Sequence, residues 1–183
     1  MNLEPTSLAG VFLVRPEAFE DERGFFTRTW TAEAMAAAGL DARLSQTSLA
    51  WNRTRGTLRG LHFQAEPYQE AKLVQCLRGA IHDVVVDVRP GSPTYLRWHA
   101  VRLEAGALEQ LYVPAGCAHG YLTLAEDALV QYHITEAHSP SHARGLRWDD
   151  PALRVAWPFA PVQVNRRDRE WPLLDPARNG GAP

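Results

Sequence analysis

Short apolar runs alternate with turns rich in glycine and proline along most of this chain. Beyond residue 42, eight segments have the length and composition of β-strands: residues 43–51, 57–64, 72–77, 81–88, 95–103, 109–113, 118–123 and 128–134. An earlier apolar run, residues 8–14, is predicted to form the first strand. The gaps are too short for crossover helices, so the pattern predicts an antiparallel sandwich or barrel, in a mainly β fold.

The one segment with a clear helical pattern is residues 31–38. It is rich in alanine, with Thr31 placed to cap its start and Gly39 placed to end it. Just before it, the acidic residues 17–22 run into Arg23-Gly24-Phe25-Phe26. We interpret this stretch either as a binding lip or as a solvated turn that precedes a core strand.

The last third of the chain has a different character. Tryptophan and proline residues predict an irregular layer, and the charge cluster at residues 166–170 is typical of solvated surface. Residues 176–183 are predicted to be a flexible tail. With 183 residues, the chain is expected to form one domain with a sizeable core.

Composition and charge exclude several classes of function. A formal net charge of -2 argues against a general nucleic-acid binder. There is no apolar run long enough to cross a membrane and no signal peptide pattern, so we expect a cytoplasmic protein without a membrane partner. Cys76 and Cys117 have no spacing suited to zinc, and we expect both to be buried free thiols.

Four polar or ionisable side chains fall within predicted strands: His62, Lys72, His119 and Tyr132. A barrel gathers inward-facing positions from distant strands, so these groups could share one cavity. Strict alternation would place Arg59 on the face opposite to His62. We therefore expect either a bulge or twist near Gly60, or an Arg59 that acts at the rim or across a dimer interface.

Acid–base chemistry fits these residue types better than a metal does. His62 and His119 supply two plausible metal ligands and no third, although a metal-dependent enzyme on this barrel stays an alternative. A neutral histidine can remove a proton, a tyrosine can return one, and a cation can stabilise the oxyanion formed between these steps. A carboxylate is expected to orient the histidine, and the candidates are Asp83, Asp87 and Asp168.

Several motifs together resemble the dTDP-4-dehydrorhamnose 3,5-epimerase family. They are Arg23-Gly24-Phe25-Phe26, residues 56–64, Lys72-Leu73-Val74, residues 83–89 with 92–94, residues 114–120, Trp148-Asp149-Asp150-Pro151 and Trp157-Pro158. They occur in the order of the family across residues 8–175, and so the resemblance covers nearly the whole chain.

The resemblance implies a cupin-type jelly roll with a short N-terminal helix and a minor C-terminal helix or irregular layer. It also implies a homodimer, no cofactor or metal, and epimerisation at C3, C5 or both of a nucleotide-linked 4-keto-6-deoxy hexose. By motif, His62 would be the base, Asp168 its carboxylate partner and Tyr132 the acid, with Lys72 at the enolate oxygen. The residues implied in substrate binding are Arg23, Phe25, Gln46, Ser48, Arg59, His119, His138 and Arg167.

Three positions depart from the family pattern, all on the nucleotide side. Arg28 stands where the family usually has glutamate, His138 stands where it has a tyrosine that stacks on thymine, and the polar pattern after Gln46 differs. One hypothesis is that the reaction class is retained but the nucleotide or the sugar differs; CDP- or GDP-linked keto sugars, and inversion of C3 or C5 alone, are then possible. The other hypothesis is ordinary sequence drift without a change of substrate, because a histidine at position 138 can still stack on a pyrimidine. A non-catalytic sugar-nucleotide-binding cupin is a further alternative, and retention of His62, Lys72, Tyr132 and Asp168 speaks against it.

Overall fold

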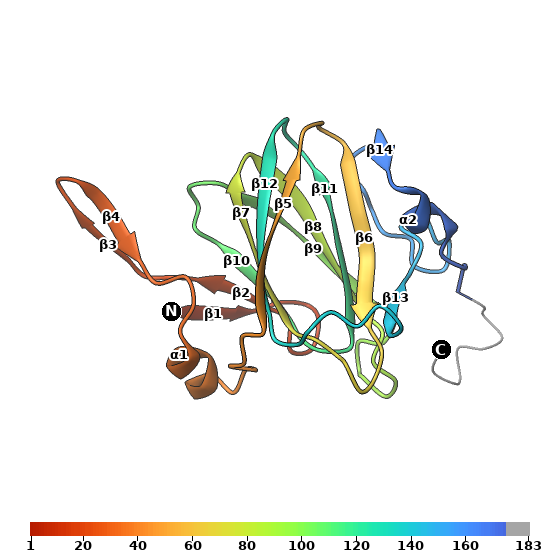
Figure 1. Cartoon of the computed structure of the whole chain (residues 1–183), viewed down its shortest axis with the longest axis horizontal. Helices are drawn as coiled ribbons and strands as arrows, with labels where there is room; N and C mark the ends of the chain where they lie inside the picture. The colour runs from red at the N-terminus through yellow and green to blue at the C-terminus, as the bar shows by residue number, and fades with distance from the viewer. Residues whose placement is uncertain (175–183) are drawn as a thin grey trace.

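The computed structural model describes residues 1–174 as two β-sheets packed face to face, with a hairpin to one side (Figure 1). The first sheet has the order β1 (Asn2–Pro5), β2 (Phe12–Arg15), β10 (Gln110–Val113), β7 (Lys72–Arg78), β12 (Ala128–Ile134), β5 (Gln46–Asn52). The second has the order β13 (Ala143–Gly145), β6 (Thr57–Gln64), β11 (Cys117–Thr123), β8 (Ala80–Asp87), β9 (Trp98–Glu104), and β14 (Gln163–Val164) pairs with β6. The predicted antiparallel sandwich is confirmed, apart from the parallel pairing of β14 with β6. The predicted flexible tail at 176–183 lies outside the described residues.

The main core lies between the two sheets. Val74 and Val130 from the first sheet meet Val85 and Tyr121 from the second, and all four side chains are fully buried. Cys76 and Cys117 belong to the same cluster as free thiols, as predicted. Burial of this apolar surface is the main force that holds the sheets together.

Strand β8 is buried on both faces. Its inward Val85 belongs to the main core, while Val84 and Val86 pack outward against Leu153 and Trp157 of the C-terminal layer. A strand covered on both sides needs no polar face, which explains the continuous apolar run in this part of the sequence.

Near the N-terminus and at β9, the predicted strand boundaries were wrong. Strand β2 begins at Phe12 rather than residue 8, because the preceding residues form a turn in which the Thr6 hydroxyl donates to the carbonyl of Val11. Strand β1 was not predicted. Strand β9 begins at Trp98 rather than residue 95, because Leu96 has a φ of +57°, which is incompatible with an extended strand.

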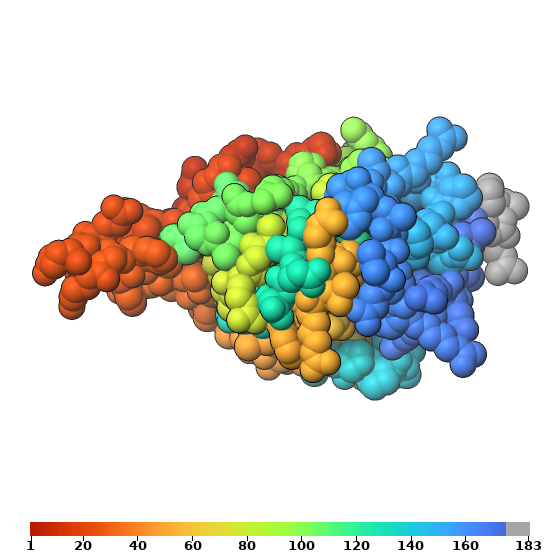
Figure 2. Space-filling model, turned by 90° about the horizontal axis from the view of Figure 1, so that it is seen from above, coloured from red at the N-terminus to blue at the C-terminus, as the bar shows by residue number. Residues whose placement is uncertain are grey.

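A two-stranded hairpin, β3 (Ala18–Asp21) and β4 (Gly24–Thr27), projects from the body of the molecule (Figures 1 and 2). Phe25 and Phe26 are 55% and 59% exposed, so the alternative of a core strand at this point was wrong. The predicted helix follows as α1 (Ala32–Ala37), and the Thr31 side chain accepts from the backbone N–H of Ala34 as expected of an N-cap.

The charge cluster near the C-terminus forms a short helix, α2 (Arg166–Glu170). Arg166 and Glu170 are exposed, as predicted for solvated surface, but Asp168 is fully buried against β6. Within the described residues, none of the helices has the length and hydropathy needed to span a membrane.

Candidate active site

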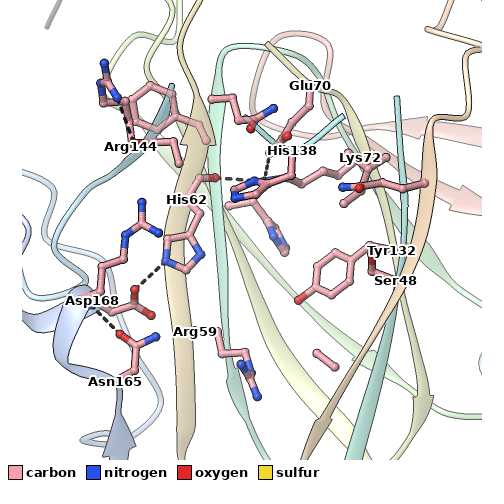
Figure 3. Close-up of a pocket in the computed structure, with 18 of the residues that line it drawn as sticks. Ser48, Arg59, His62, Glu70, Lys72, Tyr132, His138, Arg144, Asn165 and Asp168 are labelled. Atoms are coloured by element: carbon pink, nitrogen blue, oxygen red, sulfur yellow. Dashed lines mark hydrogen bonds and ion pairs between the residues drawn. The ribbon is translucent and has the colours of Figure 1, made fainter. Parts of the chain in front are cut away.

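A cavity of about 400 Å³ lies between β5, β7 and β12 on one side and β6, β11 and α2 on the other. Its walls include the predicted residues Gln46, Ser48, Arg59, His62, Lys72, His119, Tyr132, His138, Arg167 and Asp168. The fold thus brings together residues from distant parts of the sequence, as expected for a barrel (Figure 3).

Arg23 and Phe25 do not line this cavity in the same chain. Both lie on the projecting hairpin, where the Arg23 guanidinium pairs with the neighbouring Asp21 and Phe25 is mostly exposed. The expectation that they bind substrate therefore requires a second chain.

His62 is held by Asp168. The His62 Nε2 atom lies 2.6 Å from Asp168 Oδ1, and the second oxygen of Asp168 accepts from the backbone N–H of Gly60 at 3.2 Å. Asn165 caps α2 by accepting from the backbone N–H of Asp168 at 2.7 Å, which fixes the carboxylate in place. The other ring nitrogen, Nδ1, turns toward the cavity (Figure 3). It is the nitrogen free to take a proton.

A bulge in β6 places Arg59 and His62 in the same cavity. His62 pairs with His119 and Arg59 pairs with Tyr121, so three steps along β6 match two along β11. Gly60 lies in the bulge with a φ of +131°, and a Cβ there would meet the Cα of Gly120 at 2.5 Å. The bulge expected near Gly60 is confirmed, and only glycine fits it.

Tyr132 lies across the cavity from His62 (Figure 3). It is placed by β12, where it pairs with Ser48 on β5 and Val74 on β7. Burial raises the pKa of the Tyr132 hydroxyl well above 10, and the neighbouring Tyr121 raises it further. The phenol is therefore protonated at neutral pH and can donate a proton.

The three candidate aspartates have separate partners. Asp168 holds His62, whereas the fully buried Asp83 lies 2.7 Å from His119 Nε2 and forms a second histidine–aspartate pair. Asp87 lies outside the cavity and accepts from Arg89, Ser92 and Thr94. Burial alone would raise the pKa of Asp87, but these hydrogen bonds outweigh it and lower the pKa to about 2.

Lys72 is buried at the cavity wall. Its Nζ atom lies 2.9 Å from Glu70 Oε1 and donates to the main-chain carbonyl of His62 at 3.2 Å. Glu70 was not predicted from the sequence. It precedes the strand, and its position two residues before Lys72 does not indicate that the two side chains meet. Arg144 and Asn165 were not predicted either; the spacing from Asn165 to Asp168 is a helix-capping signal that could have revealed α2.

Three arginines on the cavity wall have no carboxylate partner among residues 1–174: Arg59, Arg144 and Arg167. Arg59 donates to the Asn52 side chain, Arg144 donates to backbone carbonyls, and Arg167 lies over the Trp171 ring. Because no acid within residues 1–174 neutralises them, they make this wall suitable for an anionic ligand.

The residues described contain no group of three or more His, Cys, Asp or Glu side chains arranged to hold a metal ion. His62 and His119, the two ligands that sequence reasoning considered, are each paired with an aspartate. The donor set therefore suits proton transfer, and absence of a metal requirement stays a prediction.

An oriented histidine and a protonated tyrosine on opposite walls, with a buried ammonium between them, define an acid–base isomerase built on a jelly roll. The comparisons with known proteins agree. The family model described as dTDP-4-dehydrorhamnose 3,5-epimerase matches residues 5–176, and the chain belongs to this family.

Relatives and solved structures are similar along nearly their whole length. The dTDP-4-dehydrorhamnose 3,5-epimerase of Sinorhizobium fredii is 43% identical over 175 residues, covering 95% of this chain and 90% of that protein. The dTDP-4-dehydrorhamnose 3-epimerase of Streptomyces niveus is 36% identical over 182 residues, covering 99% and 87%.

The Bacillus anthracis 3,5-epimerase, solved with TDP and pyrophosphate bound, superposes with a TM-score of 0.90 at 37% identity, covering 94% of this chain and 99% of that one. The predicted cupin-type fold and enzyme class are confirmed.

Proposed function

We propose that the protein epimerises a dTDP-linked 4-keto-6-deoxyhexose at C3, C5 or both. The observation that carries the proposal is the pairing of an oriented base, His62, with an acid, Tyr132, on the opposite wall of one cavity. The relatives are named for epimerisation of dTDP-4-dehydrorhamnose, which supports the same nucleotide and sugar class here.

The chemistry follows from the ketone at C4 of such a sugar. The ketone acidifies the hydrogens on C3 and C5, so His62 can remove one of them and leave an enolate. Lys72 stabilises the negative charge that develops on the C4 oxygen. Tyr132 then delivers a proton to the opposite face of the carbon, which inverts the centre. The sugar is neither oxidised nor reduced overall, so no redox step is required.

The cavity arginines, which have no carboxylate partner in the described part of the chain, support a nucleotide diphosphate as the rest of the substrate. Arg59, Arg144 and Arg167 can donate to phosphate oxygens, and Arg59 keeps its predicted role as a substrate anchor. His138 lies exposed at the cavity rim, where its ring can stack on the base. Gln46 and Ser48 lie on the neighbouring edge strand β5.

Exchange in deuterated water tests the reaction. The protein is incubated with dTDP-4-keto-6-deoxyglucose in D₂O, and the signals at C3 and C5 are followed by NMR. Deuterium with inversion at both carbons defines a 3,5-epimerase, and deuterium with inversion at C3 alone defines a 3-epimerase like that named for Streptomyces niveus. Absence of exchange with this sugar and with its CDP- and GDP-linked analogues would refute the proposal.

Calorimetric titration with dTDP, CDP and GDP tests the nucleotide. The proposal expects dTDP to bind most tightly. A preference for CDP or GDP would instead support the hypothesis that Arg28, His138 and the pattern after Gln46 mark a different nucleotide.

Activity after chelation and a metal analysis of the purified protein test the expectation that no cofactor is needed. A cytoplasmic location stays a prediction.

We propose further that the protein acts as a homodimer in which the β3–β4 hairpin supplies Arg23 and Phe25 to the cavity of its partner. The hairpin exposes Phe19, Phe25 and Phe26, and apolar surface of this kind favours a protein interface. The edge strand β5 beside the cavity exposes Leu49 and Trp51, which offers an apolar surface to receive it.

Complementation between two inactive variants tests this arrangement. Arg23→Ala and His62→Ala are prepared separately, mixed and allowed to exchange subunits. If Arg23 acts on the partner, each mixed dimer has one intact site, and about a quarter of wild-type activity returns on random pairing. If no activity returns although mixed dimers form, or if ultracentrifugation shows a monomer, the proposal is wrong.

A further inference from the structure

Lys72 is the only lysine in a chain that also has 18 arginines, since lysine and arginine together number 19. Elsewhere the chain uses the guanidinium group for positive charge. A lysine ammonium differs because it is a compact charge with three donors at the end of a flexible stem. Such a group must be oriented by its surroundings if it is to serve one atom of a substrate.

Two of the three donors of Lys72 are already assigned. One is directed to Glu70 Oε1 at 2.9 Å and one to the main-chain carbonyl of His62 at 3.2 Å, and Figure 3 shows both contacts meeting at the amine. Because the ammonium is tetrahedral, these contacts fix the direction of the third N–H. Lys72 lines the cavity, so the third donor is the one left for a ligand.

The carboxylate of Glu70 is suited to this task. Its side chain and that of Lys72 are each 9% exposed, and a buried ammonium without a counter-charge would be costly. The main-chain carbonyl of His62 carries no net charge and cannot replace it. Glu70 is the carboxylate that contacts Lys72 within the described part of the chain.

We propose that Glu70 is a positioning residue for catalysis, which holds the Lys72 ammonium so that its free N–H points at the oxygen where the enolate charge develops. This inference rests on the proposed epimerase reaction. Glu70 acts through Lys72 and has no role in holding the nucleotide. Loss of Glu70 should therefore lower turnover and leave nucleotide affinity unchanged.

The experiment compares Glu70→Ala and Glu70→Gln with wild type in the D₂O exchange assay. We expect Glu70→Ala to lower kcat about 10- to 100-fold, with KM within about twofold, because a misplaced catalytic group loses rate. Glu70→Gln keeps an oxygen that can accept from Lys72, and should recover part of that loss. The matched control is Glu109→Gln, which makes the same chemical change beside Arg15, outside the cavity.

A double-mutant cycle separates positioning from direct contact with the substrate. If Glu70 acts through Lys72, adding Glu70→Ala to Lys72→Ala should lower exchange less than about twofold further. The same loss in both backgrounds would show that Glu70 acts independently, and would overturn the inference. Wild-type kcat in Glu70→Ala would overturn it as well. If wild type itself shows no exchange, the proposed function fails first.

The single lysine also gives a readout that does not depend on activity. Protein labelled with ¹⁵N-lysine carries one side-chain amine, so its NMR signal needs no assignment. We expect the Nζ signal to shift, and its hydrogens to exchange faster with water, in Glu70→Ala but not in Glu109→Gln. An unchanged signal in Glu70→Ala would show that the carboxylate does not hold the ammonium.

Discussion

The Lys72 ammonium donates to the main-chain carbonyl oxygen of His62 at 3.2 Å. The cation is therefore anchored to the backbone of the proposed base, independently of the imidazole ring. Substitution of the His62 side chain can remove the base while this anchor remains. Changes at Lys72 and at His62 can thus be interpreted separately.

Replacement of Lys72 should lower turnover more than it weakens binding. The loss of one pre-placed donor at an oxyanion costs about 3 to 4 kcal/mol, so we expect Lys72→Ala to lower kcat about 10²- to 10³-fold. Steady-state kinetics on the keto sugar measure the effect. Unchanged kcat with a raised KM would contradict the role of Lys72 in the enolate step.

Tyr132→Phe should separate proton removal from inversion. His62 can still take the proton, but no acid is left on the opposite wall, so the proton or deuteron returns from the same face. We expect deuterium to enter the sugar in D₂O while the configuration is retained. If the variant still inverts at the wild-type rate, another group is the acid.

Asp168→Asn should impair proton removal itself. The amide cannot stabilise the imidazolium, and in one orientation it donates to His62 Nε2 and favours the wrong tautomer. Exchange at every centre should fall about 10²-fold or more. Asp83→Asn, which alters the His119 pair, shows whether any aspartate–histidine pair near the cavity has the same effect.

The hydrogen bonds to Asp87 should make the free energy of unfolding depend on pH in the acidic range. The pKa of Asp87 is about 2 in the folded protein, below the ordinary value of 3.8, so its stabilisation is complete above that ordinary value and is lost as the pH falls toward 2. The shift corresponds to about 2 kcal/mol. In urea unfolding, the stability difference between wild type and Asp87→Asn should narrow from pH 6 to pH 2.5. A difference that stays constant over this range would contradict the assignment.

Gly120→Ala should disturb the bulge that aims Arg59 and His62. The added Cβ would meet the Arg59 carbonyl oxygen at 2.6 Å and the Gly60 Cα at 2.9 Å, so the two strands must separate. We expect a loss of about 1 to 3 kcal/mol in unfolding free energy and a fall in kcat. Gly106→Ala is the reverse case: no other atom lies within 4 Å of its new Cβ, but its φ is +90°, so this variant measures the cost of backbone strain without a steric contact.

The positions of most strands along the sequence were visible in its polar and apolar pattern. Ile81 to Val88 read as a strand because its apolar run lies between two turn signals, and β12 occupies the predicted residues. The pattern could not place the hairpin at residues 18–27. Phe25 and Phe26 have the composition of a core strand, and nothing local indicates that they project from the fold.

Candidate site residues could be predicted from the sequence where they belong to a motif. They could not be predicted where only the packing of the fold brings them to the cavity. His62 and Asp168 followed from the family resemblance, and the structure brings them within hydrogen-bonding distance. Glu70 could be predicted neither from a motif nor from the residue pattern, because a glutamate two residues before a lysine resembles ordinary surface charge. The shared cavity of Arg59 and His62 depends on the extra residue in β6, which alternation alone cannot supply.

Asp168, which holds the proposed base His62, lies 106 residues further along the chain. A ribosome makes the β6 histidine early and the α2 aspartate late, and until residue 168 has emerged the imidazole has no carboxylate beside it. Under the proposed mechanism, a nascent chain can therefore assemble most of the cavity walls before its base is oriented. Full activity is then expected only after α2 docks against β6.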